Sequence, residues 1–133
     1  MKYKIFALVL GVSLLAAACN SNSNTTTSNT PPPPPSTEVL SGTVEIDITS
    51  SGFTPSDVTV KSGTVVTFKN TDSSKQHWPA SNPHPSHTDL PGFDSLKGLA
   101  QNETYSFTFT KLGKWKFHDH LNERLGGSVT VVE

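Results

Sequence analysis

His118 and His120, near the C-terminus of this 133-residue chain, have the type and spacing of two ligands for one metal ion. They end the run from Gly113 to His120, in which aromatic residues alternate with polar ones. If this run is a β-strand, side chains two residues apart point to the same face, so both imidazoles face the same ion. The alternative is an exposed strand end with two solvated histidines. A complete site needs further ligands from elsewhere in the fold.

The other three histidines, His77, His84 and His87, lie together upstream, in a stretch from about residue 70 to 98 that is rich in Pro and Ser. Long connections without regular structure are usually functional or disordered. Pro83 and Pro85 flank His84 and stiffen the backbone, which lowers the entropy lost when a ligand is ordered. We expect this stretch to complete the metal site. The alternative for His84 and His87 is a polar loop that only covers it.

Two aspartates and a tryptophan accompany these histidines. Asp94 is expected to accept a hydrogen bond from a ligand histidine, which would fix the tautomer of that ring. Asp119 stands between His118 and His120 and is expected to point away from the face that they share. Trp78 is interpreted as a packing residue that shields the metal from water.

Short β-strands must position these groups, because several stretches alternate between apolar and polar residues, as at Val44, Ile46 and Ile48. Strands are predicted at residues 44–49, 57–61, 64–69, 104–110, 114–118 and 128–132. Gly126-Gly127 is interpreted as a turn into the last of them. No stretch has a helical period of any length. The pattern therefore predicts an all-β fold, an antiparallel β-sandwich.

Residues 1–18 have the pattern of an export signal: Lys2 and Lys4 precede an apolar centre and a small-residue exit. The apolar part is too short to span a membrane comfortably. The order Leu-Ala-Ala-Ala-Cys at residues 15–19 resembles the lipobox of bacterial lipoproteins, which implies lipidation of Cys19. That family prefers leucine three residues before the cysteine, where this chain has Ala16. The alternatives are a secreted protein with a spare thiol and an uncleaved anchor.

Residues 19–38 are dominated by Asn, Ser, Thr and Pro and are predicted to form a disordered tether, while residues 39–133 form one folded domain. Loss of Lys2 and Lys4 with the signal takes the formal net charge from −1 to −3. A weakly acidic domain is poorly suited to nucleic acid. The predicted location is outside the cytoplasm, periplasmic or at the cell surface, with a bacterial membrane reached through the lipid on Cys19.

Residues 53–72, followed by His77, resemble the cupredoxins, the copper domains of the plastocyanin and azurin type. The matching run is Phe-Thr-Pro-Ser-Asp-Val-Thr-Val-Lys-Ser-Gly-Thr-Val-Val-Thr-Phe-Lys-Asn-Thr-Asp. The resemblance continues at residues 105–109, 113–117 and 127–131, and it covers residues 42–133. It implies a Greek-key β-sandwich with the metal held by loops at one end.

The resemblance implies His77 as the first ligand, but the remaining family ligands are absent. Blue-copper members add Cys, His and usually Met from the last loop, and the thiolate suits the site to electron transfer. Here His118 stands in the position of the cysteine, the only cysteine is Cys19, and the only methionine is Met1. Residue counting therefore excludes a blue copper site.

The sequence at His118 and His120 is similar to the Trp-Tyr-His-x-His strand of multicopper oxidase domains, where paired histidines hold non-blue copper. This similarity implies a type 2-like copper site on His77, His118 and His120. A further ligand, or a second and weaker site, would come from His87 or His84. Imidazole also suits zinc, which is the alternative metal.

The expected function is copper capture, buffering or delivery by an exported, membrane-tethered protein. A copper-donating, copper-accepting or redox protein would be its partner. Electron transfer is the alternative, and a zinc-binding or metal-free interaction module is a further one. No acid/base pair or nucleophile constellation stands out, so an enzyme is not expected. The enzymatic alternative is copper with an open coordination position that reacts with small oxidants.

Overall fold

A computed structural model describes residues 38–133 of the chain. This part consists of β-strands joined by turns and loops, and it contains no helix. The strands are β1 (Val39–Leu40), β2 (Thr43–Thr49), β3 (Gly52–Thr54), β4 (Asp57–Lys61), β5 (Thr64–Asn70), β6 (Pro79–Ser81), β7 (Thr104–Phe109), β8 (Gly113–Asp119) and β9 (Asn122–Val132).

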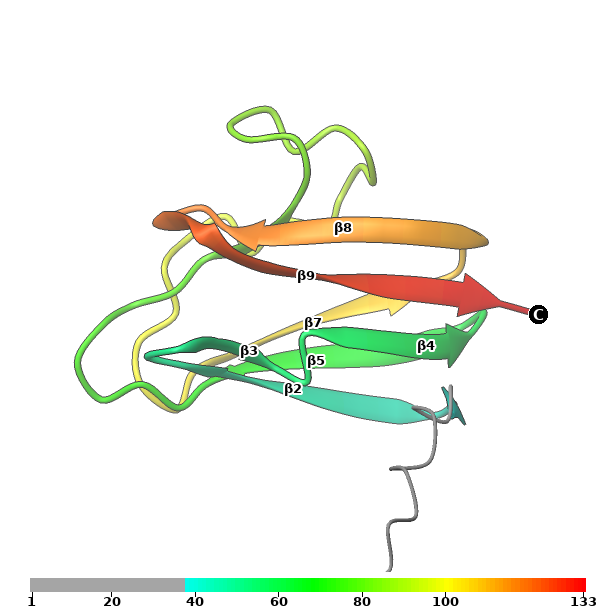
Figure 1. Ribbon diagram of the computed structural model, residues 1–133, viewed down its shortest axis with the longest axis horizontal. Coiled ribbons are helices and arrows are strands. Elements are labelled where there is room, and N and C mark those ends of the chain that lie inside the picture. The colour runs from blue at the N-terminus through cyan, green and yellow to red at the C-terminus, as the bar shows by residue number, and fades with distance from the viewer. Residues whose placement is uncertain (1–37) are drawn as a thin grey trace, which may run out of the picture. The chain divides into compact units, whose positions relative to one another are not determined.

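The strands form two sheets that pack as a sandwich, which confirms the predicted all-β fold (Figure 1). One sheet has the order β1-β4-β9-β8-β6 and the other β3-β2-β5-β7. Both sheets are mixed rather than purely antiparallel, since β2 pairs with β5, and β4 with β1 and β9, in parallel. Parallel neighbours need a crossover connection. Between β2 and β5 the chain provides one by crossing to the other sheet for β4.

The core lies between the sheets and follows from the alternation in the sequence. Ile46 and Ile48 in β2 are fully buried, while Glu45 is exposed and Asp47 is half-buried. Phe68 from β5 and Phe93 from the connection after β6 stack with ring centroids 5.3 Å apart. Burial of an aromatic side chain stabilises a fold by about 2–3 kcal/mol relative to leaving it exposed. Phe93 therefore ties a long connection to the centre of the domain.

The last strand starts at Asn122 rather than at Ser128, so the prediction that Gly126-Gly127 form a turn is wrong. Both glycines lie inside β9, where another part of the backbone comes very close. A Cβ atom at Gly127 would collide with the carbonyl oxygen of Ser56, and one at Gly126 with that of Phe117. These glycines thus allow close approach of two chain segments instead of a change of direction.

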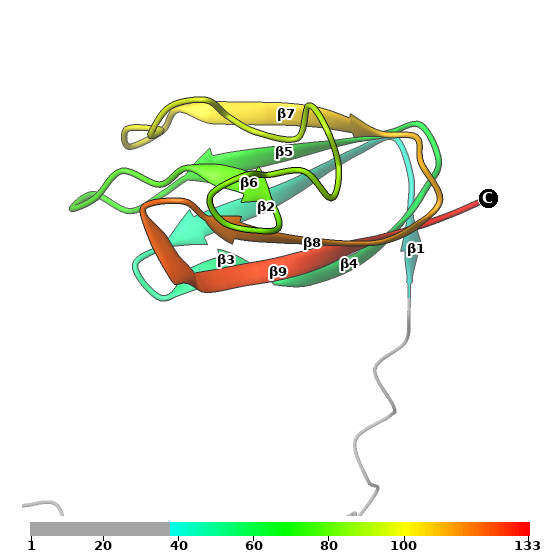
Figure 2. The same ribbon diagram turned by 90° about the horizontal axis from the view of Figure 1, so that it is seen from above.

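The outer face of β8 is covered by the connection between β6 and β7, which rises above β8 in Figure 1. Trp115 and Phe117 pack toward the core, so His118, which is next to Phe117 in the strand, points to the outer face. We call residues 82–94 the covering segment. Its end is held at the sheet edge by a bridge between Ala80 of β6 and Asp94. β6 itself is the edge strand beside β8 (Figure 2).

The predicted export signal, Cys19 and the tether up to residue 37 lie outside the described residues. Among residues 38–133, no helix has the length and apolar character needed to cross a membrane.

Candidate metal centre

Four histidines converge under the covering segment. His84 and His87 come from this segment, and His118 and His120 come from the end of β8 and the residue that follows it. One ring nitrogen from each lies within 4.8 Å of the corresponding nitrogens of the other three. His118 is buried, His87 and His120 are half-buried, and His84 is exposed. We call this group the histidine cluster.

Two hydrogen bonds, one from a backbone amide and one from a side-chain hydroxyl, close the turn that carries His84 and His87. The amide of His87 donates to the carbonyl of Pro83 at 2.8 Å, and the Ser81 hydroxyl donates to the carbonyl of His87 at 2.9 Å. His87 has a φ of 51°, a left-handed conformation that is uncommon for residues other than glycine. These contacts hold the covering segment folded over His118.

Asn82 sets the tautomer of His118. The Nδ1–H of His118 donates to Oδ1 of Asn82 at 3.0 Å. The pKa of His118 is lowered by burial and by its three histidine neighbours, so the ring is neutral at pH 7. In a neutral ring with a proton on Nδ1, the lone pair lies on Nε2. That Nε2 atom is 3.3 Å from Nδ1 of His84, inside the cluster.

Asp94 orients the ring of His87 as Asn82 orients that of His118. This is the hydrogen bond from a histidine that the sequence predicted for Asp94. Its Oδ2 lies 2.7 Å from Nδ1 of His87. Burial opposes ionisation of Asp94, but hydrogen bonds from the Trp78 indole, the Leu96 amide and His87 lower the pKa of its carboxyl group. An ionised carboxylate only accepts, so Nδ1 of His87 donates in this contact and Nε2 is the ring atom left to bind a metal. This Nε2 lies 3.0 Å from Nδ1 of His120.

Trp78 packs against His120 at one side of the cluster. Its ring centroid lies 4.4 Å from that of His120. Its backbone carbonyl accepts from the amide of His120 at 2.8 Å. The indole therefore packs against His120 and donates a hydrogen bond to Asp94. Its shielding of a metal from water stays a prediction.

These four donors could hold a single metal ion. An ion about 2.0–2.1 Å from each imidazole nitrogen places neighbouring nitrogens about 2.8–3.0 Å apart in a square-planar site and about 3.3–3.4 Å apart in a tetrahedral one. The two nitrogen pairs at 3.0 and 3.3 Å have these separations, and the other pairs, all within 4.8 Å, would draw together around an ion. Two of the four lone pairs are already aimed into the cluster by Asn82 and Asp94. Four imidazoles suit copper, zinc and nickel, whereas calcium and magnesium prefer oxygen ligands.

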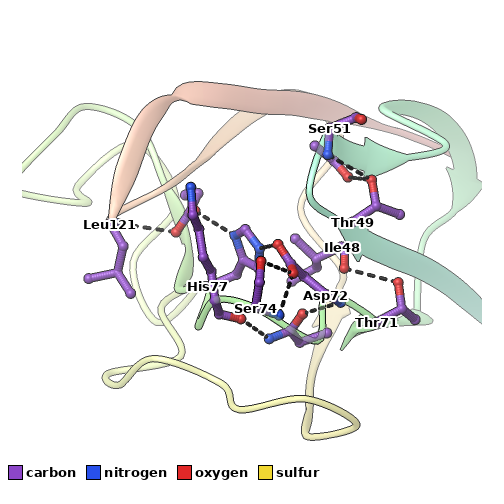
Figure 3. Close-up of polar contacts among 12 residues, drawn as sticks. Ile48, Thr49, Ser51, Thr71, Asp72, Ser74, His77 and Leu121 are labelled. Atoms are coloured by element: carbon purple, nitrogen blue, oxygen red, sulfur yellow. Dashed lines mark hydrogen bonds and ion pairs between the residues drawn. The ribbon is translucent and has the colours of Figure 1, made fainter.

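His77 lies outside the cluster. Its Nδ1 is 2.8 Å from Oδ2 of Asp119, and its Nε2 is 3.3 Å from Oδ2 of Asp72 (Figure 3). Two hydrogen bonds from Ser74, together with the contact to His77, hold the pKa of Asp72 at about 2. Asp119 points away from the cluster, as its place between two histidines predicts.

The structure brings together four of the five histidines predicted as ligands and places His77 outside the cluster. Asn82, which contacts His118, was not predicted. Nothing in the sequence around Asn82 marks it as a partner of His118, because the two residues meet only when the covering segment folds over β8. The assignment of the histidines as ligands stays a prediction.

Comparison with solved structures agrees with this architecture. A purple cupredoxin from Nitrosopumilus maritimus is 23% identical, with a TM-score of 0.58 over 67% of this chain and 99% of that chain. A Cu(I) form of an amicyanin mutant is 27% identical, with a TM-score of 0.57 over 71% and 87%. A copper-containing nitrite reductase from Thermus scotoductus is 24% identical, with a TM-score of 0.58 over 71% of this chain and 23% of that chain.

No curated protein sequence matches the chain. The family model described as cupredoxin-like domain matches residues 7–131, which is most of the chain. The sandwich, the family match and the solved structures agree: the chain belongs to the family of cupredoxin-like domains.

Proposed function

We propose that this chain is an exported, membrane-tethered protein that binds one copper ion through the histidine cluster and captures, buffers or delivers it. The convergence of four imidazoles, two with their lone pairs oriented by Asn82 and Asp94, carries the proposal. Export and anchoring are supported by the signal-like residues 1–18 and the lipobox-like order before Cys19.

Copper is preferred over other divalent ions on the chemistry of the donors. Affinity of a nitrogen site rises along the first-row metals to a maximum at Cu(II) and falls again at Zn(II). Solved structures with this fold include a Cu(I) amicyanin and a copper nitrite reductase. Among residues 38–133 there is neither cysteine nor methionine, so the copper would be non-blue.

Capture and delivery are supported by access to the cluster from solvent. His84 is exposed, and His84 and His118 both line a surface depression of about 400 Å³. Glu123 and Arg124 form another part of its lining. A metal at this depression is accessible to a chelating partner without unfolding of the sandwich.

Electron transfer is the second candidate, because amicyanin structures with this fold exist in Cu(I) and oxidised forms. A thiolate-free site reorganises more between Cu(I) and Cu(II) than a blue site does. The two functions are separated by the rates of reduction and reoxidation of the copper-loaded chain. Rates far below those of a blue copper protein support storage or delivery, and comparable rates support electron transfer.

The copper site is tested on the full chain, purified without a histidine tag and titrated with Cu(II). Visible absorption and electron paramagnetic resonance are recorded at each step. We expect one copper per chain, a weak and broad visible band, and the wide copper hyperfine splitting of nitrogen-ligated type 2 copper. If the chain does not bind stoichiometric copper, or if it keeps bound Zn(II) in excess copper, the copper proposal is wrong. A zinc-binding or metal-free module would then replace it.

Copper affinity is expected to fall as the pH drops below about 6.5, the ordinary pKa of histidine, because protons compete for the lone pairs. His118, with its lowered pKa, keeps its lone pair to lower pH than an ordinary histidine. The stability of the metal-free domain should change with pH in the same direction as the copper affinity. Because folding lowers the pKa of His118, protonation of this ring favours the unfolded chain. The free energy of unfolding is therefore unaffected by His118 titration above about pH 6.5 and decreases as the pH falls below it. The measurement is a chelator competition from pH 8 to 4, and copper retained at pH 4 would contradict an all-histidine site.

A further inference from the structure

The ring of His77 is held in place by carboxylates on both sides, and the proposed copper site does not use it. His77, Asp119 and Asp72 are 2%, 1% and 6% exposed. Each ring nitrogen of His77 faces a different carboxylate, so neither is directed at the cluster. Figure 3 shows His77 beside Asp72. His77 and Asp119 also line a second depression of about 420 Å³, whose lining contains no member of the cluster.

The backbone of His77 is fixed as firmly as its ring. Its amide donates to the carbonyl of Leu99 at 3.2 Å, and the amide of Leu99 donates back at 2.7 Å. The side chain of Asn70 donates to the carbonyls of Leu99 and Lys75, which ties the residues before His77 to the same place. His77 is therefore a fixed point from which other groups can be positioned.

His77 contacts Asp119, which stands between two cluster histidines. Oδ1 of Asp119 accepts from the amides of Trp78 at 2.8 Å and Leu121 at 3.1 Å, and Oδ2 accepts from His77. The pairing of β8 with β9 becomes irregular between His118 and Asp119. At such an irregularity the sheet ladder does not fix the direction of the following side chain. The contacts of Asp119 fix it instead.

We propose that His77 is a positioning residue for the copper site: through Asp119 it fixes the end of β8 so that His118 and His120 face one ion. The inference rests on the proposed function, and it differs from the sequence-based expectation that His77 is a ligand. Without the His77 donor, a buried carboxylate loses one of its partners, and its rearrangement moves the backbone on both sides.

The test compares His77→Gln and His77→Leu in the full chain loaded with Cu(II). Glutamine has an amide N–H that can donate to Asp119, whereas leucine has no donor. Copper affinity is measured by chelator competition, and pulsed electron paramagnetic resonance counts the bound imidazoles. We expect His77→Leu to weaken binding about 10–100-fold, as loss of an outer partner typically does. His77→Gln should restore most of the affinity, and the imidazole count should equal that of the wild type in both.

The matched control is Lys75→Leu, at an exposed position two residues away, which should bind like the wild type. A count that falls by one in His77→Gln would make His77 a ligand and overturn the inference. Wild-type affinity in His77→Leu would also overturn it, while leaving the copper function intact. A wild-type chain that binds no copper would overturn both proposals.

Asp119→Asn provides a second variant if His77→Leu does not fold. It keeps an oxygen for the amides of Trp78 and Leu121 and replaces the acceptor that faces His77 with a donor. We expect a copper affinity at least about 10-fold weaker than that of the wild type. Unchanged affinity in a folded Asp119→Asn protein would count against the positioning role.

Discussion

His118→Ala is expected to abolish stoichiometric copper binding, with a loss greater than the roughly 100-fold that removal of an outer partner can cause. His118 is the buried member of the cluster, and its lone pair is aimed inward by Asn82. Its replacement leaves three imidazoles, one of them exposed, and removes the contact between β8 and His84. The type 2 resonance signal and the weak visible band should both disappear at one equivalent of Cu(II).

Lys116→Ala is the matched control for this variant. Lys116 lies two residues earlier on the same face of β8, is exposed, and is not a member of the cluster. It should leave the copper spectrum and the affinity unchanged. A His118→Ala protein that retains the wild-type spectrum would show that copper binds elsewhere in the chain.

Phe93→Ala is expected to lower the free energy of unfolding by about 3–5 kcal/mol, the usual cost of removing a buried phenylalanine side chain. Phe93 is 0% exposed. Its ring centroid lies 5.3, 5.2 and 5.3 Å from those of Phe68, Phe107 and Phe109. For a domain of this size, each kcal/mol shifts the melting temperature by roughly 4–8 °C. Denaturant titration and calorimetry of the metal-free chain measure the effect.

The same variant should also weaken copper binding, because Phe93 is next to Asp94, which orients His87. Leu96→Ala is the control in the same connection. Leu96 is 77% exposed, so its replacement should change stability by no more than about 0.5 kcal/mol. A loss below 1 kcal/mol for Phe93→Ala would mean that the covering segment is not anchored in the core.

The strands could be predicted because their burial pattern is local. Ile46 and Ile48 are apolar at a spacing of two, and both are fully buried. The parallel pairing of β2 with β5 could not be predicted, because it depends on which distant strands become neighbours. The start of β9 was missed because Glu123 and Arg124 are exposed and their segment has no alternation.

The histidines of the candidate site could be predicted in part from local sequence, as the strands could. The spacing of His118 and His120 and the prolines around His84 are visible in the sequence, and the structure brings these histidines together. The environment of His77 is not visible, because Asp72 and Asp119 reach it from a turn and from a different strand. A position shared with a family's ligand therefore does not by itself establish that the side chain faces the metal.

The cluster draws its donors from two parts of the chain, a strand end and the covering segment. His84 and His118 are 34 residues apart, and His87 and His120 are 33 apart. A filled site is therefore a reversible cross-link that closes a long loop of the backbone, in the manner of a disulfide bond. Loop closure of this kind restricts the unfolded chain more than the folded one. Under the proposed function, bound copper would therefore slow the cutting of this protein by proteases, and copper-loaded chains would survive longer than metal-free ones.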